Sequence, residues 1–358
     1  MNSTMAKPKT VFVGMSGGVD SSVTAVLLKN AGYHVVGVYM KNWSKDLPGM
    51  KCPWAEDLAD AKRVATKLDI DFRIFDFETE YHAKVVDYMI EEFRKGNTPN
   101  PDVMCNQEIK FKLFYDIAMS QGADFIATGH YAVSEDGNLK LATDTNKDQT
   151  YFLYRISDEA ISRTLFPLGK MLKPEVKQLA AEFGLDNAYK KESMGVCFVG
   201  EVGIKDFLQE YIEVTPGQII DRDTNRVLGM HEGAVFYTIG QRHGLNLGGG
   251  LPYYVVGKDM SKNQVFVSKN LNHLNLWTKT LKLKDVIIRQ IHQETGSMQP
   301  NLSNLTCRVR HRAPLINCSF NPDTNEVTLS EEIKHPAAGQ SVVFYADDIC
   351  IGGGIIAE

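Results

Sequence analysis

Short apolar runs alternate with amphipathic stretches over the first 130 positions of the chain. Apolar, partly β-branched runs predict buried strands at 10–13, 34–40, 72–75 and 124–128. Apolar residues at helical spacing predict helices at 23–28, 55–68, 79–93 and 111–119. Gly32 follows the first helix at the position where glycine ends helices. Strands that alternate with helices predict an α/β doubly wound, mostly parallel sheet.

The pattern changes in the second half of the chain. Asp136-Gly137 predicts a hairpin turn, and three further helices are expected at 149–154, 174–183 and 204–211. After about residue 215 short strands dominate, and a second set begins near residue 280 at the spacing of a small barrel or sandwich. We therefore expect an α/β catalytic domain at 1–214, a small central β-rich domain at 215–279 and a C-terminal β-barrel at 280–358.

Composition sets limits on the class of protein. The 358 residues are 43% hydrophobic and 23% charged, which is ordinary for a globular chain with two or three domains. No apolar run is long enough to cross a membrane, and residues 1–9 lack the apolar core of a signal peptide. A cytoplasmic protein with no membrane partner is expected. The net charge of −5 argues against nucleic-acid binding by global charge but leaves room for a local basic surface.

The stretch Gly14-Met15-Ser16-Gly17-Gly18-Val19-Asp20-Ser21-Ser22 lies between the first strand and the first helix. A strand, a glycine loop and a helix together aim backbone N–H groups at an anion. The stretch lacks the lysine of a GxxxxGK[ST] loop and the spacing of GxGxxG. Asp20 could help to hold a metal ion or the loop itself. A tight turn with no ligand is the alternative, although such a turn needs only one glycine.

Two further segments end predicted strands of the same sheet. Met40 ends the second strand, and Gly129-His130 follows the fourth. Ligands of doubly wound sheets lie beyond the carboxyl ends of the strands. These positions therefore support a nucleotide site beside the glycine loop. His130, taken alone, could equally be a structural histidine.

Cysteine chemistry is possible at two loops. Cys105 follows the Pro-rich segment 96–104 near an expected helix start, where the helix dipole favours a thiolate, and Asp102 is close enough to act as a local acid or base. Asp102 could instead cap that helix. Cys197 lies in a second, glycine-flanked loop, and spacing alone leaves these two thiols unrelated. The six cysteines include no CxxC pair, which disfavours a disulfide framework or a zinc ribbon. Near the C-terminus Arg308, Arg310 and Arg312 alternate, so they are expected on one strand face, either solvated or facing phosphates.

Several motifs in order resemble one family over essentially the whole chain. SGGVDSS resembles the pyrophosphate loop of ATP pyrophosphatases. Together with NPDVMCNQEIKF, ATGHYA, Lys147-Asp148-Gln149-Thr150-Tyr151 and SMGVCFVG, it resembles the tRNA-specific 2-thiouridylase family. The similarity extends to Tyr237-Thr238-Ile239-Gly240-Gln241-Arg242 and to Gly339-Gln340.

That resemblance implies a reaction and a set of site residues. ATP, expected with Mg²⁺, would bind Gly14, Met15, Ser16, Gly17, Gly18, Val19, Asp20, Ser21, Met40 and Gly129, and the C2 oxygen of the wobble uridine would be adenylated. Cys197 would carry a persulfide delivered by a relay protein or a cysteine desulfurase, Cys105 would close a transient disulfide on it, and Asp102 would be the general acid/base. Contacts to tRNA would come from Asn100, Pro101, Asp102, His130, Lys147, Asp148, Gln149, Arg310, His311 and Gln340.

Two other functions remain open from the residues. A small-molecule ligase of the same superfamily would not need the Cys105 and Cys197 combination or a C-terminal barrel. A non-catalytic RNA-binding protein with a vestigial nucleotide fold would be expected to have lost Asp20 or the two thiols, and all three are present.

Overall fold

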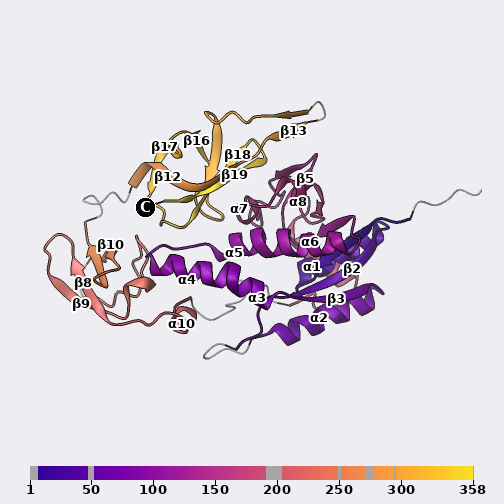
Figure 1. Ribbon diagram of the computed structural model, residues 1–358, viewed down its shortest axis with the longest axis horizontal. Helices are drawn as coiled ribbons and strands as arrows, with labels where there is room; N and C mark the ends of the chain where they lie inside the picture. The colour runs from indigo at the N-terminus through magenta and orange to yellow at the C-terminus, as the bar shows by residue number, and fades with distance from the viewer. Residues whose placement is uncertain are drawn as a thin grey trace, which may run out of the picture.

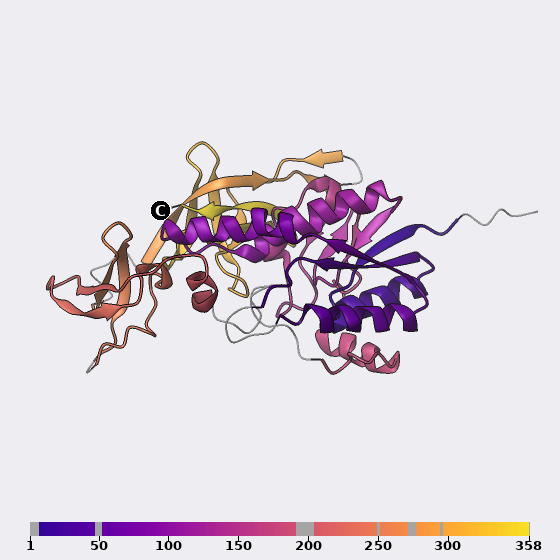
Figure 2. The same ribbon diagram turned by 60° about the horizontal axis from the view of Figure 1, so that its bottom comes forward.

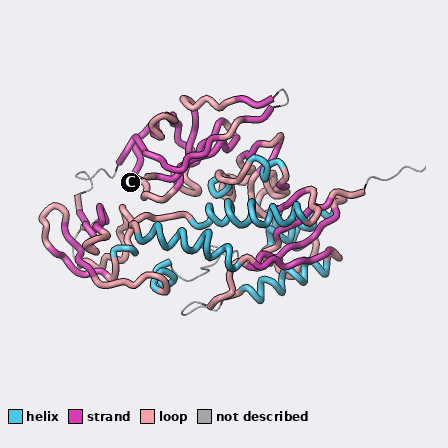
Figure 3. The backbone as a smooth tube through the Cα atoms, in the orientation of Figure 1, coloured by secondary structure: helices cyan, strands magenta, loops and turns pink. Residues whose placement is uncertain are grey.

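Three β-rich units are joined by two long helices in the computed structural model of the chain (Figure 1). It describes residues 7–46, 52–190, 204–248, 251–270, 277–293 and 296–357. The parallel sheet lies at one end of the molecule, the small central sheet at the other, and the barrel packs along one side of the helices (Figures 1 and 2). Helices concentrate around the first sheet, whereas the other two units are built almost wholly of strands and loops (Figure 3).

The first sheet confirms the predicted doubly wound topology. Its five parallel strands lie in the order β3 (Asp71–Asp76), β2 (His34–Lys41), β1 (Thr10–Gly14), β4 (Phe125–Ala127) and β7 (Thr164–Leu165). The chain winds outward from β1 to β3 and then returns to place β4 on the other side of β1. The switch point, where such sheets bind ligands, therefore lies between β1 and β4.

Helices cover both faces of this sheet because β1 is apolar on both sides. Val11 and Val13 face one layer and Phe12 the other. The first layer contains α1 (Val19–Asn30), α2 (Trp54–Lys67) and α9 (Lys173–Glu182). The second layer contains two long helices, formed by α3, η1 and α4 (Glu78–Tyr81, His82–Val86, Asp87–Arg94) and by α5, η2 and α6 (Pro101–Met104, Cys105–Leu113, Phe114–Ser120).

The sequence placed the start of the last of these helices incorrectly. The predicted helix 111–119 begins ten residues earlier, at Pro101. The side chain of Asn100 accepts a hydrogen bond from the Val103 N–H, and Pro101 occupies the first turn, where its missing N–H costs nothing. The helix thus starts directly after the second of the two Pro steps rather than well beyond them.

The central sheet lies at the far end of α4. Its strands follow the order β10 (Tyr254–Asp259), β11 (Gln264–Ser268), β8 (Gly217–Asp221) and β9 (Val227–His231). Lys258 of β10 donates a hydrogen bond of 2.6 Å to the Gly96 carbonyl, just past the end of α4. The short segments α10 (Ile204–Gln209) and η3 (Ala234–Phe236) complete this region.

The C-terminal strands close into the predicted barrel. Six antiparallel strands lie in the order β12 (Trp277–Ile288), β17 (Glu326–Lys334), β16 (Ile316–Asn321), β15 (Leu305–Arg308), β18 (Ser341–Ala346) and β19 (Ile349–Ile356). Pairing of β12 with β19 closes the ring. A hairpin, β13 (Ile291–Gln293) and β14 (Gly296–Met298), extends from it.

The barrel also takes in part of the N-terminal half of the chain. The predicted Asp136-Gly137 hairpin forms as β5 (Val133–Glu135) and β6 (Asn138–Lys140), and Lys140 pairs with Ile349 of β19. The small helices α7 (Thr150–Leu153) and α8 (Asp158–Ser162) follow this hairpin. The N-terminal half of the chain and the barrel are therefore connected by main-chain pairing through this hairpin. No helix among the described residues is both long and apolar enough to span a membrane.

Candidate functional site

The glycine loop is fixed by its own serines. The Ser21 hydroxyl donates to the Gly18 carbonyl at 3.1 Å and accepts a hydrogen bond from the Ser16 N–H at 3.2 Å. Ser22 donates to the same Gly18 carbonyl at 2.9 Å. The first turn of α1 is thereby held rigidly against the end of β1. A loop in this arrangement offers backbone N–H groups to an anion without having to reorganise.

Two glycines are required by close backbone approaches. Gly17 has φ +76°, and a Cβ there would lie 2.3 Å from the Asp57 carbonyl oxygen. A Cβ on Gly129 would lie 2.7 Å from the Ser21 nitrogen. The segment after β4 thus packs directly on the start of α1, across the switch point. Met40 also packs against the end of β1: a Cβ added to Gly14 would lie only 2.9 Å from the Met40 Cε. The three strand ends named by the sequence therefore meet at one place.

A buried lysine completes this loop. The ammonium of Lys173, at the start of α9, lies 2.6 Å from Oδ1 and 2.8 Å from Oδ2 of Asp20. The Tyr131 hydroxyl donates to Oδ1 of the same carboxylate at 3.1 Å. Sequence reasoning missed both residues. Lys173 is 153 residues from Asp20 and directly precedes the Pro174 that was used only to locate a helix.

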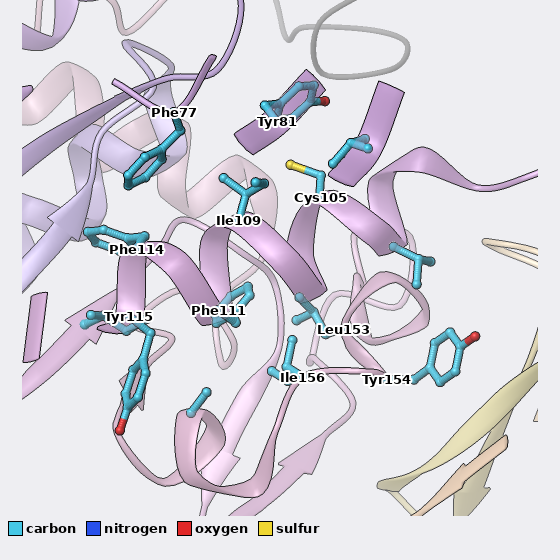
Figure 4. Packing of buried hydrophobic residues seen from close by; sticks show 14 of the residues in the cluster. Phe77, Tyr81, Cys105, Ile109, Phe111, Phe114, Tyr115, Leu153, Tyr154 and Ile156 are labelled. Carbon is cyan, nitrogen blue, oxygen red and sulfur yellow. The ribbon is translucent and has the colours of Figure 1, made fainter. Parts of the chain in front are cut away.

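Cys105 lies on the helix that runs beside the loop. It is the fifth residue of the helix that starts at Pro101, and its buried side chain lies near Tyr81 and Ile109 (Figure 4). At the other end of η2, Phe114 lies against Gly14. Cys105 precedes Phe114 by nine positions, which corresponds to roughly 10–14 Å along the helix axis. The Cys105 helix belongs to the second layer, whereas the helix that follows the glycine loop belongs to the first, so the two pack on opposite faces of the sheet.

Asp102 and its neighbours are at the start of that helix. Asp102 lies in the first turn and is half-buried, whereas the capping hydrogen bond comes from Asn100, so the capping alternative for Asp102 does not hold. The side-chain amide of Gln340 donates a hydrogen bond of 2.6 Å to the Thr98 carbonyl, and the Thr98 N–H donates one of 2.8 Å to the Ala338 carbonyl. The barrel therefore fixes the segment that leads into Asn100-Pro101-Asp102.

His130 is positioned between the loop and this helix. Its Nδ1 lies 2.8 Å from the Thr128 hydroxyl, and its ring packs at 5.6 Å from the Phe111 ring. Burial, with a contribution from Lys110, lowers the pKa of His130 well below its usual range. The ring is therefore neutral at pH 7 and can serve as a hydrogen-bonding or stacking group rather than as a cation.

The 147–149 segment and the 308–311 segment, which the sequence could not relate, meet in space. Arg308 donates 2.7 Å to the buried Asp148 carboxylate, which also accepts from the Thr150 hydroxyl at 2.6 Å. The His311 ring packs 4.5 Å from that of Phe152. Asp148 is 1% exposed, so its side chain serves to join α7 to the barrel, and Lys147, Gln149 and Arg310 are more accessible.

One expectation about the arginines is wrong. Arg308, Arg310 and Arg312 do not share a strand face, because β15 ends at Arg308. Arg308 is buried, Arg310 is exposed, and Arg312 adopts a positive φ of 62° in the turn that follows. The chain turns directly after Arg308, with the Ala313 N–H donating a hydrogen bond to the Arg310 carbonyl. Lys190 is paired with Asp57.

Replacing Asp148 by asparagine is expected to destabilise the protein by about 3–5 kcal/mol, because Arg308 would keep a buried charge with no counter-ion. Equilibrium denaturation of the variant measures this loss. The double variant Asp148→Asn, Arg308→Met should recover a large part of it, since no unpaired charge remains. Equal losses in the single and double variants would contradict this account.

His311 gives a pH dependence with a definite sign. Burial, together with Arg312 and Arg308, lowers the pKa of His311 to about 4. The unfolded chain takes up this proton near pH 6.5, so between pH 6.5 and 4 the unfolded state binds more protons and stability falls as pH falls. The free energy of unfolding, measured between pH 4 and 6.5, should change less steeply with pH for His311→Phe than for the parent protein. An unchanged slope would contradict the assignment.

Cys197 and its surrounding motif lie outside the described residues, so its distance from Cys105 stays a prediction. Among the residues that the structure does describe, no cluster of three His, Cys, Asp or Glu side chains is placed to hold a metal ion. Asp20 is the carboxylate of the glycine loop, but both of its oxygens are paired with the Lys173 ammonium, so Mg²⁺ here would depend mainly on phosphate oxygens.

Comparison with known proteins identifies the family. Residues 9–201 match the "tRNA methyl transferase HUP domain", 205–269 the "tRNA methyl transferase PRC-barrel domain" and 283–356 the "Aminomethyltransferase beta-barrel domain". The chain is 45% identical to the tRNA-specific 2-thiouridylase MnmA of Idiomarina loihiensis. The alignment spans 363 positions and covers 98% of this chain and 96% of that protein. The chain belongs to the tRNA-specific 2-thiouridylase family.

Other matches are consistent with that membership. The MnmA of Lactiplantibacillus plantarum is 45% identical over 359 residues, covering 97% of this chain and 94% of that protein. A solved 4-thiouridine synthetase–RNA complex with bound ATP is 18% identical, covers 51% of this chain and 43% of that chain, and has a TM-score of 0.34, too low to carry an argument. Membership in the 2-thiouridylase family thus rests on the full-length relatives and on the three family domains in the same order.

Proposed function

We propose that the chain is an ATP-dependent sulfurtransferase that converts the wobble uridine of tRNA to 2-thiouridine. The observation that carries this proposal is the full-length identity of 45% to tRNA-specific 2-thiouridylases. The meeting of Gly14, Met40 and Gly129 at the switch point supports it independently, because this is where a doubly wound sheet binds a nucleotide. The proximity of these three positions supports the assignment of a nucleotide to the switch point.

Adenylation is the first step of the proposed reaction. ATP binds with its phosphates on the N–H groups of the loop formed by Gly14, Met15, Ser16, Gly17, Gly18, Val19, Asp20 and Ser21, with Met40 and Gly129 beside it. The C2 oxygen of uridine attacks the α-phosphorus, and the bond to the β-phosphate oxygen breaks with its electron pair going to pyrophosphate. The N3 proton passes to a base, the role assigned to Asp102. The carbonyl oxygen thereby becomes part of a good leaving group, AMP.

Sulfur transfer follows. A persulfide on Cys197 attacks C2, and AMP leaves with the former uridine oxygen. The Cys105 thiolate then attacks the Cys197 sulfur, forms a Cys105–Cys197 disulfide and releases the 2-thiouridine. In a variant of this step Cys105 attacks first and releases hydrosulfide, which then displaces AMP. Both routes leave a disulfide, so each turnover requires a two-electron reductant such as a dithiol before Cys197 can accept sulfur again.

The tRNA is proposed to lie across the first sheet and the barrel. Asn100-Pro101-Asp102 and His130 would face the flipped-out base, and Lys147, Asp148, Gln149, Arg310, His311 and Gln340 would contact or position the anticodon region. The Arg308–Asp148 pair and the Gln340–Thr98 hydrogen bond support this arrangement, because they fix the barrel against both predicted RNA-binding segments. Divisions near residues 215 and 280 would separate catalytic, linking and tRNA-gripping parts.

Three accessory requirements complete the proposal. Mg²⁺, which neutralises phosphate charge when bound, would be held mainly by the phosphate oxygens of the nucleotide, since both oxygens of Asp20 are paired with Lys173. A persulfide-relay protein or a cysteine desulfurase would supply the sulfur. The enzyme would act in the cytoplasm, where a transient catalytic disulfide is compatible with a reducing environment.

The proposal is tested by incubating the protein with ATP, Mg²⁺, a persulfide donor and unmodified tRNA, followed by digestion and mass analysis of the nucleosides. We expect 2-thiouridine together with AMP and pyrophosphate. AMP without any tRNA-dependent product would favour a small-molecule ligase instead. Binding of tRNA without AMP or 2-thiouridine would favour a non-catalytic RNA-binding protein.

A further inference from the structure

Lys173 is a lysine in an unusual environment. It is the first residue of α9 and is 6% exposed. Its ammonium lies within 2.8 Å of both carboxylate oxygens of Asp20 and 5.8 Å from the centre of the Tyr131 ring. Lysine is almost never this buried unless it is paired, because its charge loses hydration. The ammonium is therefore held at the glycine loop by a specific carboxylate.

The backbone around Lys173 is also fixed. Its N–H donates a hydrogen bond of 3.0 Å to the buried Asp144 carboxylate. The N–H of the preceding Leu172 donates one of 2.7 Å to the Glu175 carboxylate. The start of α9 is thus anchored at two successive residues. A lysine on a firmly positioned helix end can keep its ammonium at one place, which is what a catalytic charge requires. Stability alone does not explain the ion pair, because an apolar pair of similar volume is often as stable.

The charge balance of the loop requires a cation at this position. Asp20 is the one charged residue of the stretch 14–22, and it is acidic. The triphosphate of ATP brings several more negative charges to the same N–H groups. P-loop enzymes meet this need with a lysine inside the loop, which is absent here. The neighbouring Lys190 is paired with Asp57 and Asp60 of α2, so its charge is shared between two carboxylates.

We propose that Lys173 is a catalytic residue of the adenylation step, whose ammonium contacts the departing pyrophosphate and stabilises the charge that develops on it. This inference rests on the proposed function. As the uridine oxygen bonds to the α-phosphorus, the bond to the β-phosphate oxygen breaks and its electron pair moves onto pyrophosphate, next to Lys173. No oxidant or reductant is involved. Asp20 and Tyr131 act as positioning residues that hold the ammonium there before ATP binds.

The test measures how adenylation depends on the basicity of the leaving group. ATP analogues in which CH₂, CHF or CF₂ replaces the β,γ-bridging oxygen give leaving groups of graded basicity. Single-turnover AMP formation on tRNA is compared for the parent enzyme, Lys173→Met and the exposed control on the same helix, Lys177→Met. With ATP, Lys173→Met is expected to slow this step by about a hundredfold or more. Its rate should also depend more steeply on leaving-group basicity than that of the parent or of Lys177→Met.

The dependence of the adenylation rate on leaving-group basicity decides the proposal. A Lys173→Met slope equal to that of the parent overturns it, whatever the absolute rate, because a merely structural loss lowers all rates by the same factor. If the methionine variant does not fold, Lys173→Gln takes its place under the same criterion. A parent enzyme that forms neither AMP nor 2-thiouridine with ATP would contradict the proposed function instead.

Discussion

Gly17→Ala is expected to lower kcat/KM for ATP by at least about a hundredfold and to reduce stability by about 2 kcal/mol or more. The added Cβ would lie 2.3 Å from the Asp57 carbonyl oxygen, and its contacts at that residue are all backbone atoms that cannot move aside. The φ of +76° adds a strain that alanine cannot avoid. The loop must therefore shift away from α2, and the N–H groups that would receive the phosphates shift with it. Calorimetric titration with a non-hydrolysable ATP analogue measures how much of the loss in kcat/KM is a loss of ATP affinity.

Two other glycines separate the causes of this effect. Gly32 has a similar φ of +85° but nothing within 4 Å of an added Cβ, so Gly32→Ala should cost about 1 kcal/mol of stability and leave ATP affinity unchanged. Gly18 has φ −84°, and an added Cβ would meet only the Ser16 hydroxyl at 3.4 Å, so Gly18→Ala should fold stably. Reduced ATP affinity in Gly18→Ala would then report a phosphate close to that residue. Parental ATP affinity in Gly17→Ala would contradict the proposed loop function.

Cys197→Ser and Cys105→Ser are each expected to lower 2-thiouridine formation by at least about a thousandfold while pyrophosphate is still released. Adenylation needs neither thiol, whereas sulfur delivery needs both. The two variants should differ in one respect under single-turnover conditions without added thiol. If the persulfide attacks C2 directly, Cys105→Ser should accumulate a covalent enzyme–tRNA adduct that a dithiol releases, and Cys197→Ser should not.

The buried cysteines of the barrel provide the control. Cys318 lies in β16, in the barrel core with Cys307, and Cys318→Ser should retain thiolation. No adduct and no product in Cys105→Ser would indicate release of hydrosulfide before attack on C2. Full thiolation in Cys105→Ser or in Cys197→Ser would contradict the two-cysteine mechanism.

The parts of the fold that follow from local patterning could be predicted from the sequence. Strand β1 follows from an apolar run, and helix α1 follows from the helical spacing of its apolar residues. Gly32 was expected to end that helix, and its φ of +85° agrees. The glycine loop could be singled out from the sequence as a candidate phosphate-binding loop because such a loop is built from consecutive residues. The barrel could be predicted as a class, since short strands at regular spacing require closure or stacking.

Contacts between distant segments could not be predicted in this way. Lys173 reaches Asp20 across 153 positions, and Arg308 reaches Asp148 across 160. Single lysines and arginines carry no signal of their partner in the sequence. The alternation of Arg308, Arg310 and Arg312 suggested a continuous strand, but the strand ends at Arg308 and a turn containing Arg312 follows. Local pattern was overridden at the places where two units of the fold meet.

The fate of the uridine oxygen tests the central claim most directly. An anticodon stem-loop or tRNA that carries oxygen-18 at C2 of the wobble uridine is converted in a single turnover, and the AMP is analysed by mass spectrometry. The account predicts that the label appears in the AMP phosphate and is absent from pyrophosphate, because adenylation turns that oxygen into the leaving group. Unlabelled AMP alongside 2-thiouridine would contradict it.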